Sequence, residues 1–504
     1  MIARLLTPFA LLLLGITASC SNTLDPYPSA VFVVDTDMAV PRFVDRVRVD
    51  TYASDGTWMD SHDYAILNAR DWPVSFGIYS TDDTKERTLY VRLRGYTAAR
   101  RRDYHGERYL DASGVRPGML PPKANQQLPR LIVGGKDVTP ADEPEPMTTI
   151  DRLVEVVLRP GKTGAINILL SGECMGTMAR TSFAGSYSPF VPAEAGTCID
   201  KSNVRVAMVE SPLAERATGP TRQGTWQPTT ACTATGPGTT CVPGGAFFIG
   251  SPQSLGWGLS SVPQRVVGLS PFRVDSNEVT VGAWRAAVTG GLVSPDSTPW
   301  PYEAAFPSAP VPNFVGCTYS NAPMSREDFP INCVTFAAAR TFCKSKGGDI
   351  PTEAQWEYLA SAVGRPAETP YPWGSGDYPD CKKSVHSRSY GSLPGLSACN
   401  ASGFGPQPVT TAIASGNDVN PLGVMNLAGS VGEWTLDTPA SYDDPCWLET
   451  GMKDTKCVVE GEPHVVRGSY WNTEQTVVSN RLAPDYLGYY DSSLGFRCAY
   501  PVIP

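Results

Sequence analysis

The residues of this 504-residue chain whose side chains could most readily do chemistry are its thirteen cysteines. None of them forms a Cys-x-x-Cys pair, so the spacing indicates neither a zinc ribbon nor a thioredoxin-type redox site. Apart from Cys20 they make an even set of twelve, which in an exported chain is typical of disulfides. Sequence alone leaves the connectivity open, but pairing of neighbours would give Cys174–Cys198, Cys232–Cys241, Cys317–Cys333, Cys381–Cys399 and Cys446–Cys457.

The N-terminus predicts export. The apolar run Leu5–Thr17 is too short to span a bilayer permanently, so residues 1–19 are interpreted as a cleaved signal peptide. Cys20 resembles the lipid-modified cysteine of bacterial lipoproteins, although Thr17 differs from the leucine usually found three positions before it. We therefore expect a lipid-anchored protein of the outer membrane or cell envelope, facing the periplasm or the exterior, with a secreted soluble protein as the alternative.

Composition narrows the classes of partner and fold. The net charge of −9 is spread along the chain, and a mildly acidic protein repels phosphate backbones, so nucleic acid is not an expected partner. The counts of 47 glycines and 46 prolines with only 18% charged residues favour short strands and turns over long helices.

The elements of the first half are expected to be strands. A short tether, residues 20–29, leads into residues 30–210, where runs such as Arg42–Tyr52 and Thr88–Tyr96 alternate apolar and polar side chains. Period-two runs separated by turns predict an antiparallel, all-β sandwich. Residues 211–243 are rich in proline, threonine and glycine, which predicts a linker to a second domain at 244–504.

The second half is expected to carry short helices among loops. Helices are predicted over Val279–Val288, Val334–Gly348 and Pro351–Ala362, with the threonines Thr280, Thr335 and Thr352 as N-caps. Thr352 and Gln355 also stand at capping-box spacing. Trp356 and Leu359 share a face of the third helix and are expected in the core.

Several motifs in this half occur in a recognisable order. They are "GGAFFIGSP" (Gly244–Pro252), "INCVTFAAARTFCKSKGGDIPTEAQWEYLASA", "GVMNLAGSVGEWTLD" (Gly423–Asp437), "VVRGSYW" and "SSLGFRCAY" (Ser492–Tyr500). Together they resemble the formylglycine-generating enzyme family, also called the sulfatase-modifying-factor domain, over about half of the chain. The resemblance implies an α/β C-type-lectin-like fold with little regular secondary structure, and a disulfide between Cys343 and Cys498.

The resemblance also implies a structural calcium ion. The family's ligands correspond to the Asn426 side chain, the Gly429 and Val431 carbonyls, and the Glu433 carboxylate. Oxygen ligands of this kind suit Ca²⁺, although Asn426 and Glu433 could instead hydrogen-bond within their loop.

The catalytic centre of the family departs from its pattern in this chain. The resemblance implies that in active members this region has the motif G-S-F-x-C, followed by a second cysteine five residues later. The two thiolates bind Cu(I), a soft ion that prefers sulfur. Ser469 and Tyr470 match the motif, but Asn472 and Val477 stand where the cysteines would be. Copper is therefore not expected, and neither is copper-dependent formylglycine generation.

The leading hypothesis is a non-catalytic pseudoenzyme domain that binds a protein or glycan at the cell envelope. Aromatic loops often stack on such ligands, and the groove would use Arg467, Ser469, Tyr470, Trp471, Asn472, Tyr489 and Tyr490. Tyr489 and Tyr490 could equally cover the core.

Two alternatives from other classes stay open. One is an oxidoreductase of the same family with an altered centre. Some relatives use iron held by a histidine cluster, but the histidines His62, His105, His386 and His464 of this chain are not at ligand spacing. Acid–base catalysis by Glu433 with Asp437 also stays open, although an acidic side chain at the position of Asp437 is usually just solvated. The other alternative is a structural envelope protein, which would expose an apolar patch on the sandwich.

Overall fold

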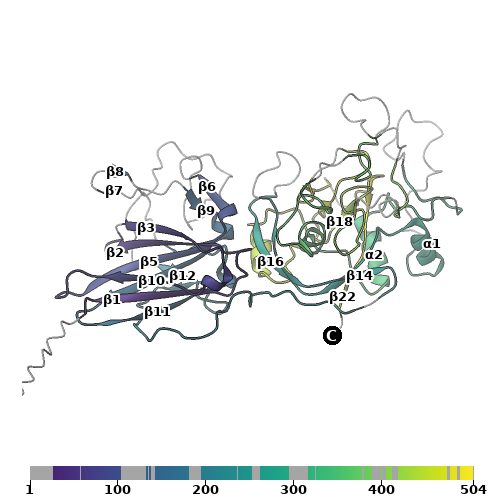
Figure 1. The fold of residues 1–504 in the computed structure, drawn as a ribbon. Helices are drawn as coiled ribbons and strands as arrows, with labels where there is room; N and C mark the ends of the chain where they lie inside the picture. The colour runs from purple at the N-terminus through teal and green to yellow at the C-terminus, as the bar shows by residue number, and fades with distance from the viewer. Residues whose placement is uncertain are drawn as a thin grey trace, which may run out of the picture.

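The computed structural model describes residues 26–502, except 57, 104–131, 134–135, 138–141, 181–194, 235, 252–260, 295–315, 324, 377–379, 389–398, 400–404, 411–417, 474–476 and 485–487. The predicted signal peptide and Cys20 lie outside these residues. Long strands occupy the first half, and short strands with a few helices occupy the second (Figure 1). Within the described part of the chain, none of the helices combines the length and the apolar character needed to span a membrane.

Two sheets of the first half share one hydrophobic core, which includes Phe32, Val49 and Val91. The order β11-β1-β4 joins Thr163–Leu170, Ser29–Thr36 and Val74–Tyr79, and the order β10-β5-β2-β3 joins Ile150–Leu158, Arg87–Tyr96, Arg46–Ala53 and Trp58–Ala65. Short pairs flank them: β6 (Arg101–Asp103) with β9 (Asp142–Pro144), β7 (Ile132–Val133) with β8 (Lys136–Asp137), and β12 (Gly196–Thr197) with β13 (Val206–Ala207).

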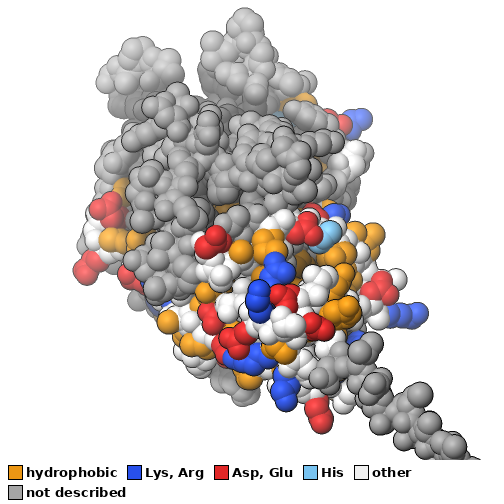
Figure 2. Space-filling view, turned by 90° about the vertical axis from the view of Figure 1, so that its left-hand side faces the viewer, with side chains coloured by type: hydrophobic (Ala, Val, Ile, Leu, Met, Phe, Trp, Pro, Cys, Tyr) orange, Lys and Arg blue, Asp and Glu red, His pale blue; other side chains and the backbone are white. Residues whose placement is uncertain are grey.

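The expectation of antiparallel pairing is wrong for one pair of described strands, because β1 runs parallel to β11. These two strands lie far apart in sequence, and the intervening strands supply the long crossover that parallel neighbours need. The face at the free end of this half mixes hydrophobic side chains with charges of both signs (Figure 2). Tyr64, Leu67 and Tyr79 are 43%, 64% and 64% exposed.

The segment 211–243 connects the halves but is not a free linker. Ala214 exchanges two backbone hydrogen bonds with Ala165 on β11, at 2.7 and 2.8 Å. Trp226 is only 7% exposed, and its indole packs into the N-terminal core while its Nε1 donates to Glu173. The composition, rich in proline, threonine and glycine, predicted a linker; a buried tryptophan and paired backbone groups fix this connecting segment against the sheet.

Direct contacts also join the two halves. Phe43 meets Phe248 edge to face, with ring centroids 5.2 Å apart. Glu368 accepts hydrogen bonds from Arg42 and from the Phe248 backbone, both at 3.1 Å. Phe248 and its neighbour across the strands, Val266, belong to the N-terminal core cluster. The domains therefore share buried surface rather than only a connecting chain.

The second half is built from short elements. Its strands are β14 (Thr239–Val242), β17 (Phe272–Asp275) and β22 (Ala499–Pro501) in one sheet, β15 (Gly245–Ile249) with β16 (Arg265–Leu269), and β20 (Arg481–Leu482), β19 (Val466–Arg467), β18 (Gly432–Trp434) and β21 (Leu494–Gly495) in the order β20-β19-β18-β21. Its helices are α1 (Val281–Thr289), α2 (Phe336–Ser345), α3 (Glu353–Glu357) with a π-helical turn (Tyr358–Ala362), and α5 (Pro445–Glu449).

The local helix predictions are confirmed. Thr280 and Thr335 accept the N-cap hydrogen bonds of α1 and α2, and Thr352 with Gln355 forms the capping box of α3. Trp356 and Leu359 are both buried in the core. All twelve cysteines from Cys174 onward are paired, in the five neighbour pairs and in the disulfide Cys343–Cys498 that the resemblance implied.

Candidate functional site

Two rows of side chains cross the small sheet that carries the family motifs. Glu433 pairs with Arg467 and Arg467 with Arg481, while Trp434 pairs with Val466 and Val466 with Leu482. Residues opposite one another across strands share a face of a sheet. One face of this sheet is therefore charged and the other apolar.

The charged row is buried and forms a network of ion pairs, although Arg467 Nε has no hydrogen-bond partner among the described residues. Arg467 donates to Glu353 at 2.8 Å, to Glu357 and to the Val478 carbonyl at 2.8 Å, and Arg481 binds Glu353 at 2.7 and 2.8 Å. Burial raises the pKa of Glu353, but the two arginines outweigh it and bring that pKa below its ordinary value. The prediction that Arg467 lines a groove is wrong, because its side chain is fully buried.

The turn after β19 places the remaining motif residues. Gly468 has φ +84°, and the Trp356 ring lies 3.3 Å from where a Cβ would be, so glycine is required there. Ser469 is 3% exposed and Trp471 is 2% exposed, with the indole nitrogen donating to the Ser492 carbonyl. These two residues are therefore core positions and not groove positions, contrary to the prediction. Tyr470 is half-buried.

Asn472 and Val477 are both half-buried in the loop that follows. Within the described part of the chain the Asn472 Oδ1 atom is buried without a hydrogen-bond partner. Every cysteine that the structure describes is in a disulfide. No thiolate is therefore available to this loop from the described residues, and the loop cannot offer the paired sulfur ligands that Cu(I) prefers.

The predicted calcium loop is already bonded to protein groups. Arg497 donates two hydrogen bonds to the Glu433 carboxylate, at 2.6 and 2.7 Å, and Trp356 Nε1 donates to it at 2.9 Å. Asn426 Nδ2 donates to Glu278 at 2.7 Å and to the Val409 carbonyl at 3.0 Å. A cation at Glu433 would compete with Arg497, so these side chains do not form a ready calcium site. Among the described residues no three His, Cys, Asp or Glu side chains are placed to hold a metal ion.

Asp437 has a structural role rather than the solvated one expected. It is fully buried and its two oxygens accept from the backbone nitrogens of Glu353 at 2.5 Å and Cys457 at 2.6 Å. Burial, with a contribution from the Glu353 charge, raises its pKa to about 7. The described contacts therefore tie Asp437 to the loops beside α3 and not to a reaction centre.

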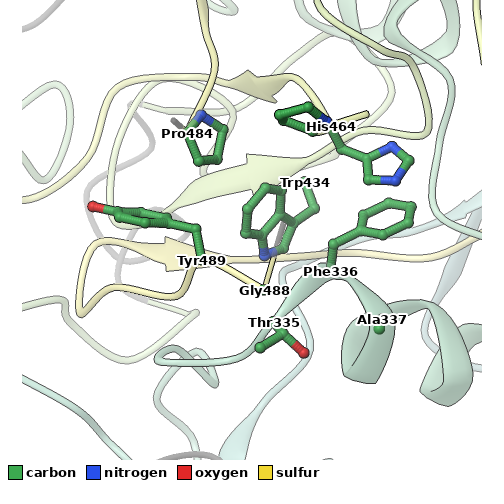
Figure 3. Close-up of a pocket in the computed structure, with 9 residues that line it drawn as sticks. Thr335, Phe336, Ala337, Trp434, His464, Pro484, Gly488 and Tyr489 are labelled. Atoms are coloured by element: carbon green, nitrogen blue, oxygen red, sulfur yellow. The ribbon is translucent and has the colours of Figure 1, made fainter. Parts of the chain in front are cut away.

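The apolar row leads to a pocket that sequence reasoning missed. Its volume is about 170 Å³, and it is lined by Thr335, Phe336, Ala337, Trp434, Pro463, His464, Pro484, Gly488 and Tyr489. The side chains come from the start of α2, the end of β18, the turn before β19 and the segment after β20 (Figure 3). We call this the aromatic pocket.

The walls of the aromatic pocket are ring surfaces. His464 stacks on Phe336 with centroids 3.4 Å apart, and Phe336 meets Trp434 edge to face at 6.1 Å. His464 Nδ1 donates to the Leu436 carbonyl at 3.0 Å, and burial lowers the pKa of the imidazole. At neutral pH the histidine therefore presents an uncharged ring. Tyr489 lines the pocket, as expected of a binding position, whereas Tyr490 is half-buried outside it.

Short strands, few helices and disulfide-tied loops around a Gly-Ser-Tyr-Trp turn define a domain of the sulfatase-modifying type. The chain belongs to the family described as "Sulfatase-modifying factor enzyme 1-like domain", whose model matches residues 225–502, more than half of the chain. It is similar to the formylglycine-generating enzyme of Thermomonospora curvata, with 27% identity over 295 residues, 52% of this chain and 93% of that protein.

Two further relatives differ in the activity that their names state. A Bos taurus protein named inactive C-alpha-formylglycine-generating enzyme 2 is 27% identical over 187 residues, 34% of this chain and 50% of that protein. The hercynine oxygenase of Mycolicibacterium smegmatis is 25% identical over 256 residues, 46% of this chain and 53% of that protein. Relatives of this domain therefore include proteins named as enzymes and proteins named as inactive.

Proposed function

We propose that this protein is a non-catalytic binding module of the cell envelope, which recognises a protein or glycan through its sulfatase-modifying-type domain. One observation carries the proposal: asparagine and valine occupy the two positions of the copper-binding cysteines, at Asn472 and Val477. All the cysteines that the structure describes are in disulfides, which supports the proposal, because no described thiol can replace the missing copper ligands. One relative is named as inactive, so a similar domain without the activity has a precedent.

Export and anchoring belong to the same proposal. Six disulfides suit an oxidising compartment. Cys20 would carry the lipid anchor after removal of residues 1–19, so that the protein faces the periplasm or the exterior. The N-terminal β-sandwich, residues 30–210, would act as a spacer that holds the second domain away from the membrane.

A structural calcium ion is also proposed, although Glu433 would have to exchange Arg497 for the ion. Asn426, Gly429, Val431 and Glu433 would supply oxygen ligands and the ion would stiffen their loop. An increase in thermal stability on addition of Ca²⁺ to chelator-treated protein would support this part, and no change would remove it without affecting the rest.

The proposal is tested by metal analysis and thiol titration of the purified Cys20→Ser chain. We expect no stoichiometric copper or iron and no thiol reactive without reductant. Stoichiometric copper, or two reactive thiols, would overturn the non-catalytic assignment and favour an oxidoreductase with a rebuilt centre.

A second candidate, a structural envelope protein, is favoured by one observation. Tyr64, Leu67 and Tyr79 are 43–64% exposed on β3, β4 and the segment between them. Exposed apolar groups can mark an assembly surface. Light scattering of the wild-type chain and of a variant with serine at all three positions discriminates the candidates. A wild-type oligomer that the variant loses supports the structural role, whereas a monomeric state of both proteins contradicts it.

A further inference from the structure

We propose that strand β4 (Val74–Tyr79) pairs edge to edge with β4 of a second copy of this chain, so that the sheet β11-β1-β4 continues across a two-fold axis at Gly77. This inference concerns the first domain. It goes beyond the function proposed for the second domain and does not depend on it. It stands on the bare edge of β4, on the backbone groups exposed there, and on the side chains that the pairing brings together.

The two sheets of the described sandwich have four edges, and three of them are covered or charged. Along β11, Ala165 exchanges its backbone hydrogen bonds with Ala214. Along β10, the Glu155 carbonyl accepts from the Ser211 nitrogen at 2.9 Å. The third edge strand, β3, exposes ionisable side chains: Asp60, His62 and Asp63. Covering segments and charges are the usual means by which proteins prevent an edge strand from pairing with another chain.

The fourth edge, β4, has neither protection. Its sequence "VSFGIY" contains no charge, and among the described strands it pairs with β1 alone. The Ser80 nitrogen donates to the Pro28 carbonyl. Because bonded and non-bonded pairs alternate along antiparallel strands, the even-numbered residues of β4 bond to β1. The backbone groups of Ser75, Gly77 and Tyr79, which are all exposed residues, therefore point to the open side.

An antiparallel pairing centred on Gly77 is self-complementary. It sets Ser75 of one copy opposite Tyr79 of the other, so that outward-pointing N–H and C=O groups meet each other. On the core side it sets Phe76 opposite Ile78 of the second copy. Both side chains are only half-buried against the core of the single chain, and aromatic and β-branched residues form favourable cross-strand pairs.

The glycine at the axis suits the close approach of two strands. Nothing described lies within 4 Å of the position that a Cβ of Gly77 would take, so the outer face is open at this point. Glycine inside a strand often marks a site where another backbone comes close. The ring of Tyr79, which is 64% exposed, is within diagonal reach of the space over Gly77 of the second copy.

The charges around this edge have both signs. Arg216 donates to Ser75 Oγ at 3.5 Å, and in the proposed register its guanidinium lies beside the Tyr79 ring of the second copy, a favourable partner for a cation. Charged residues also lie beyond the two ends of β4: Arg70, Asp71, Asp82, Asp83, Lys85, Glu86 and Arg87. These residues are exposed and outside the paired segment, so solvent and salt screen their interactions.

The test is sedimentation velocity of the Cys20→Ser chain over a series of concentrations, alone and with Gly77→Lys or Gly77→Glu. Gly77 does not have a positive φ and has room for a side chain, so both variants should keep the fold. Like charges directly opposite each other across strands are destabilising. Val31→Lys is the matched control, because Val31 lies opposite Gly77 on β1, is 38% exposed, and is one strand away from the edge.

We expect a reversible dimer of the Cys20→Ser chain, because one pair of strands buries less surface than a permanent interface. Gly77→Lys and Gly77→Glu should each weaken self-association at least tenfold, an equimolar mixture of the two should restore dimers, and Val31→Lys should leave self-association unchanged. A parent chain that stays monomeric at every concentration, an equal loss with Val31→Lys, or a mixture that stays monomeric would overturn the proposal. None of these outcomes changes the metal and thiol results, so they are distinguishable from failure of the proposed function.

Discussion

The two faces of the sheet β20-β19-β18-β21 differ in what they leave for a ligand. On the charged face, Glu433, Arg467 and Arg481 are buried and each is bound by partners within the chain. On the apolar face, Trp434 contributes to a half-open aromatic pocket. Hydrogen-bonding groups that satisfy one another stabilise the fold but offer nothing to a partner. The charged face is therefore structural, and Trp434 on the opposite face lines the aromatic pocket.

The largest expected effect comes from breaking the charged face. Arg467→Ala leaves Glu353 and Glu357 buried with one cation fewer, and loss of one partner of a buried ion pair costs about 3–5 kcal/mol. We expect this decrease in the free energy of unfolding by chemical denaturation. The control is Lys344→Ala, whose ion pair with Asp349 is solvent-exposed on the lysine side and should cost less than about 1 kcal/mol. Similar losses in the two variants would contradict the contrast between buried and exposed pairs.

The apolar face should depend on the disulfide that ties α2 to the C-terminal segment. Cys343 and Cys498 are 155 residues apart, whereas Cys232 and Cys241 are 9 apart. Because a longer closed loop restricts the unfolded chain more, replacing the first pair by serines should cost about 2–5 kcal/mol of unfolding free energy, and replacing the second pair should cost less. A larger loss from the short loop in denaturation experiments would contradict this ranking.

The stability of the protein should also respond to pH through Asp437, which accepts from the backbone nitrogen of Glu353, the acid that pairs with Arg467 and Arg481. The pKa of Asp437 is raised to about 7 in the folded protein, above the ordinary value of 3.8. A carboxyl of this kind contributes stability at low pH that is lost as the pH rises from about 4 through about 7, on the order of a few kcal/mol. We expect the unfolding free energy of wild type minus that of Asp437→Asn to fall across this window. A difference that is constant with pH would contradict the buried, protonated state.

The smallest expected effect on stability comes from the aromatic pocket. Tyr489 is half-buried and packs only partly against the core, so Tyr489→Ala should lower the free energy of unfolding by about 1 kcal/mol. A loss of stability comparable to that of Arg467→Ala would show that this face is core and not a binding surface.

Structural features that depend on residues close together in the sequence could be predicted. The caps Thr280 and Thr335 and the capping box Thr352–Gln355 depend on contacts three residues apart. Five disulfides join cysteines that are neighbours in the sequence. The family resemblance supplied the sixth, which no local rule contains.

Features that depend on distant partners could not be predicted. The partner of Arg467 is Glu353, 114 residues earlier, so burial of the arginine has no local sign. The aromatic pocket gathers four separate segments, and only Tyr489 carried a signal of its own. The segment 211–243 has the composition of a flexible linker, and its one contrary sign was Trp226, a large apolar residue among small ones. Packing, and not composition, decided its structure.

We propose that Asn472 and Val477, in place of two cysteines, remove the copper chemistry of the family from this protein. The most direct test compares Cu(I) binding, by competition with a chromogenic chelator, between the Cys20→Ser chain and the same chain with Asn472→Cys and Val477→Cys, followed by oxygen-dependent oxidation of a cysteine-containing peptide. We predict no stoichiometric Cu(I) and no oxidation with the first chain, and a gain of Cu(I) binding in the second. Stoichiometric Cu(I) and peptide oxidation by the chain without these cysteines would contradict the account.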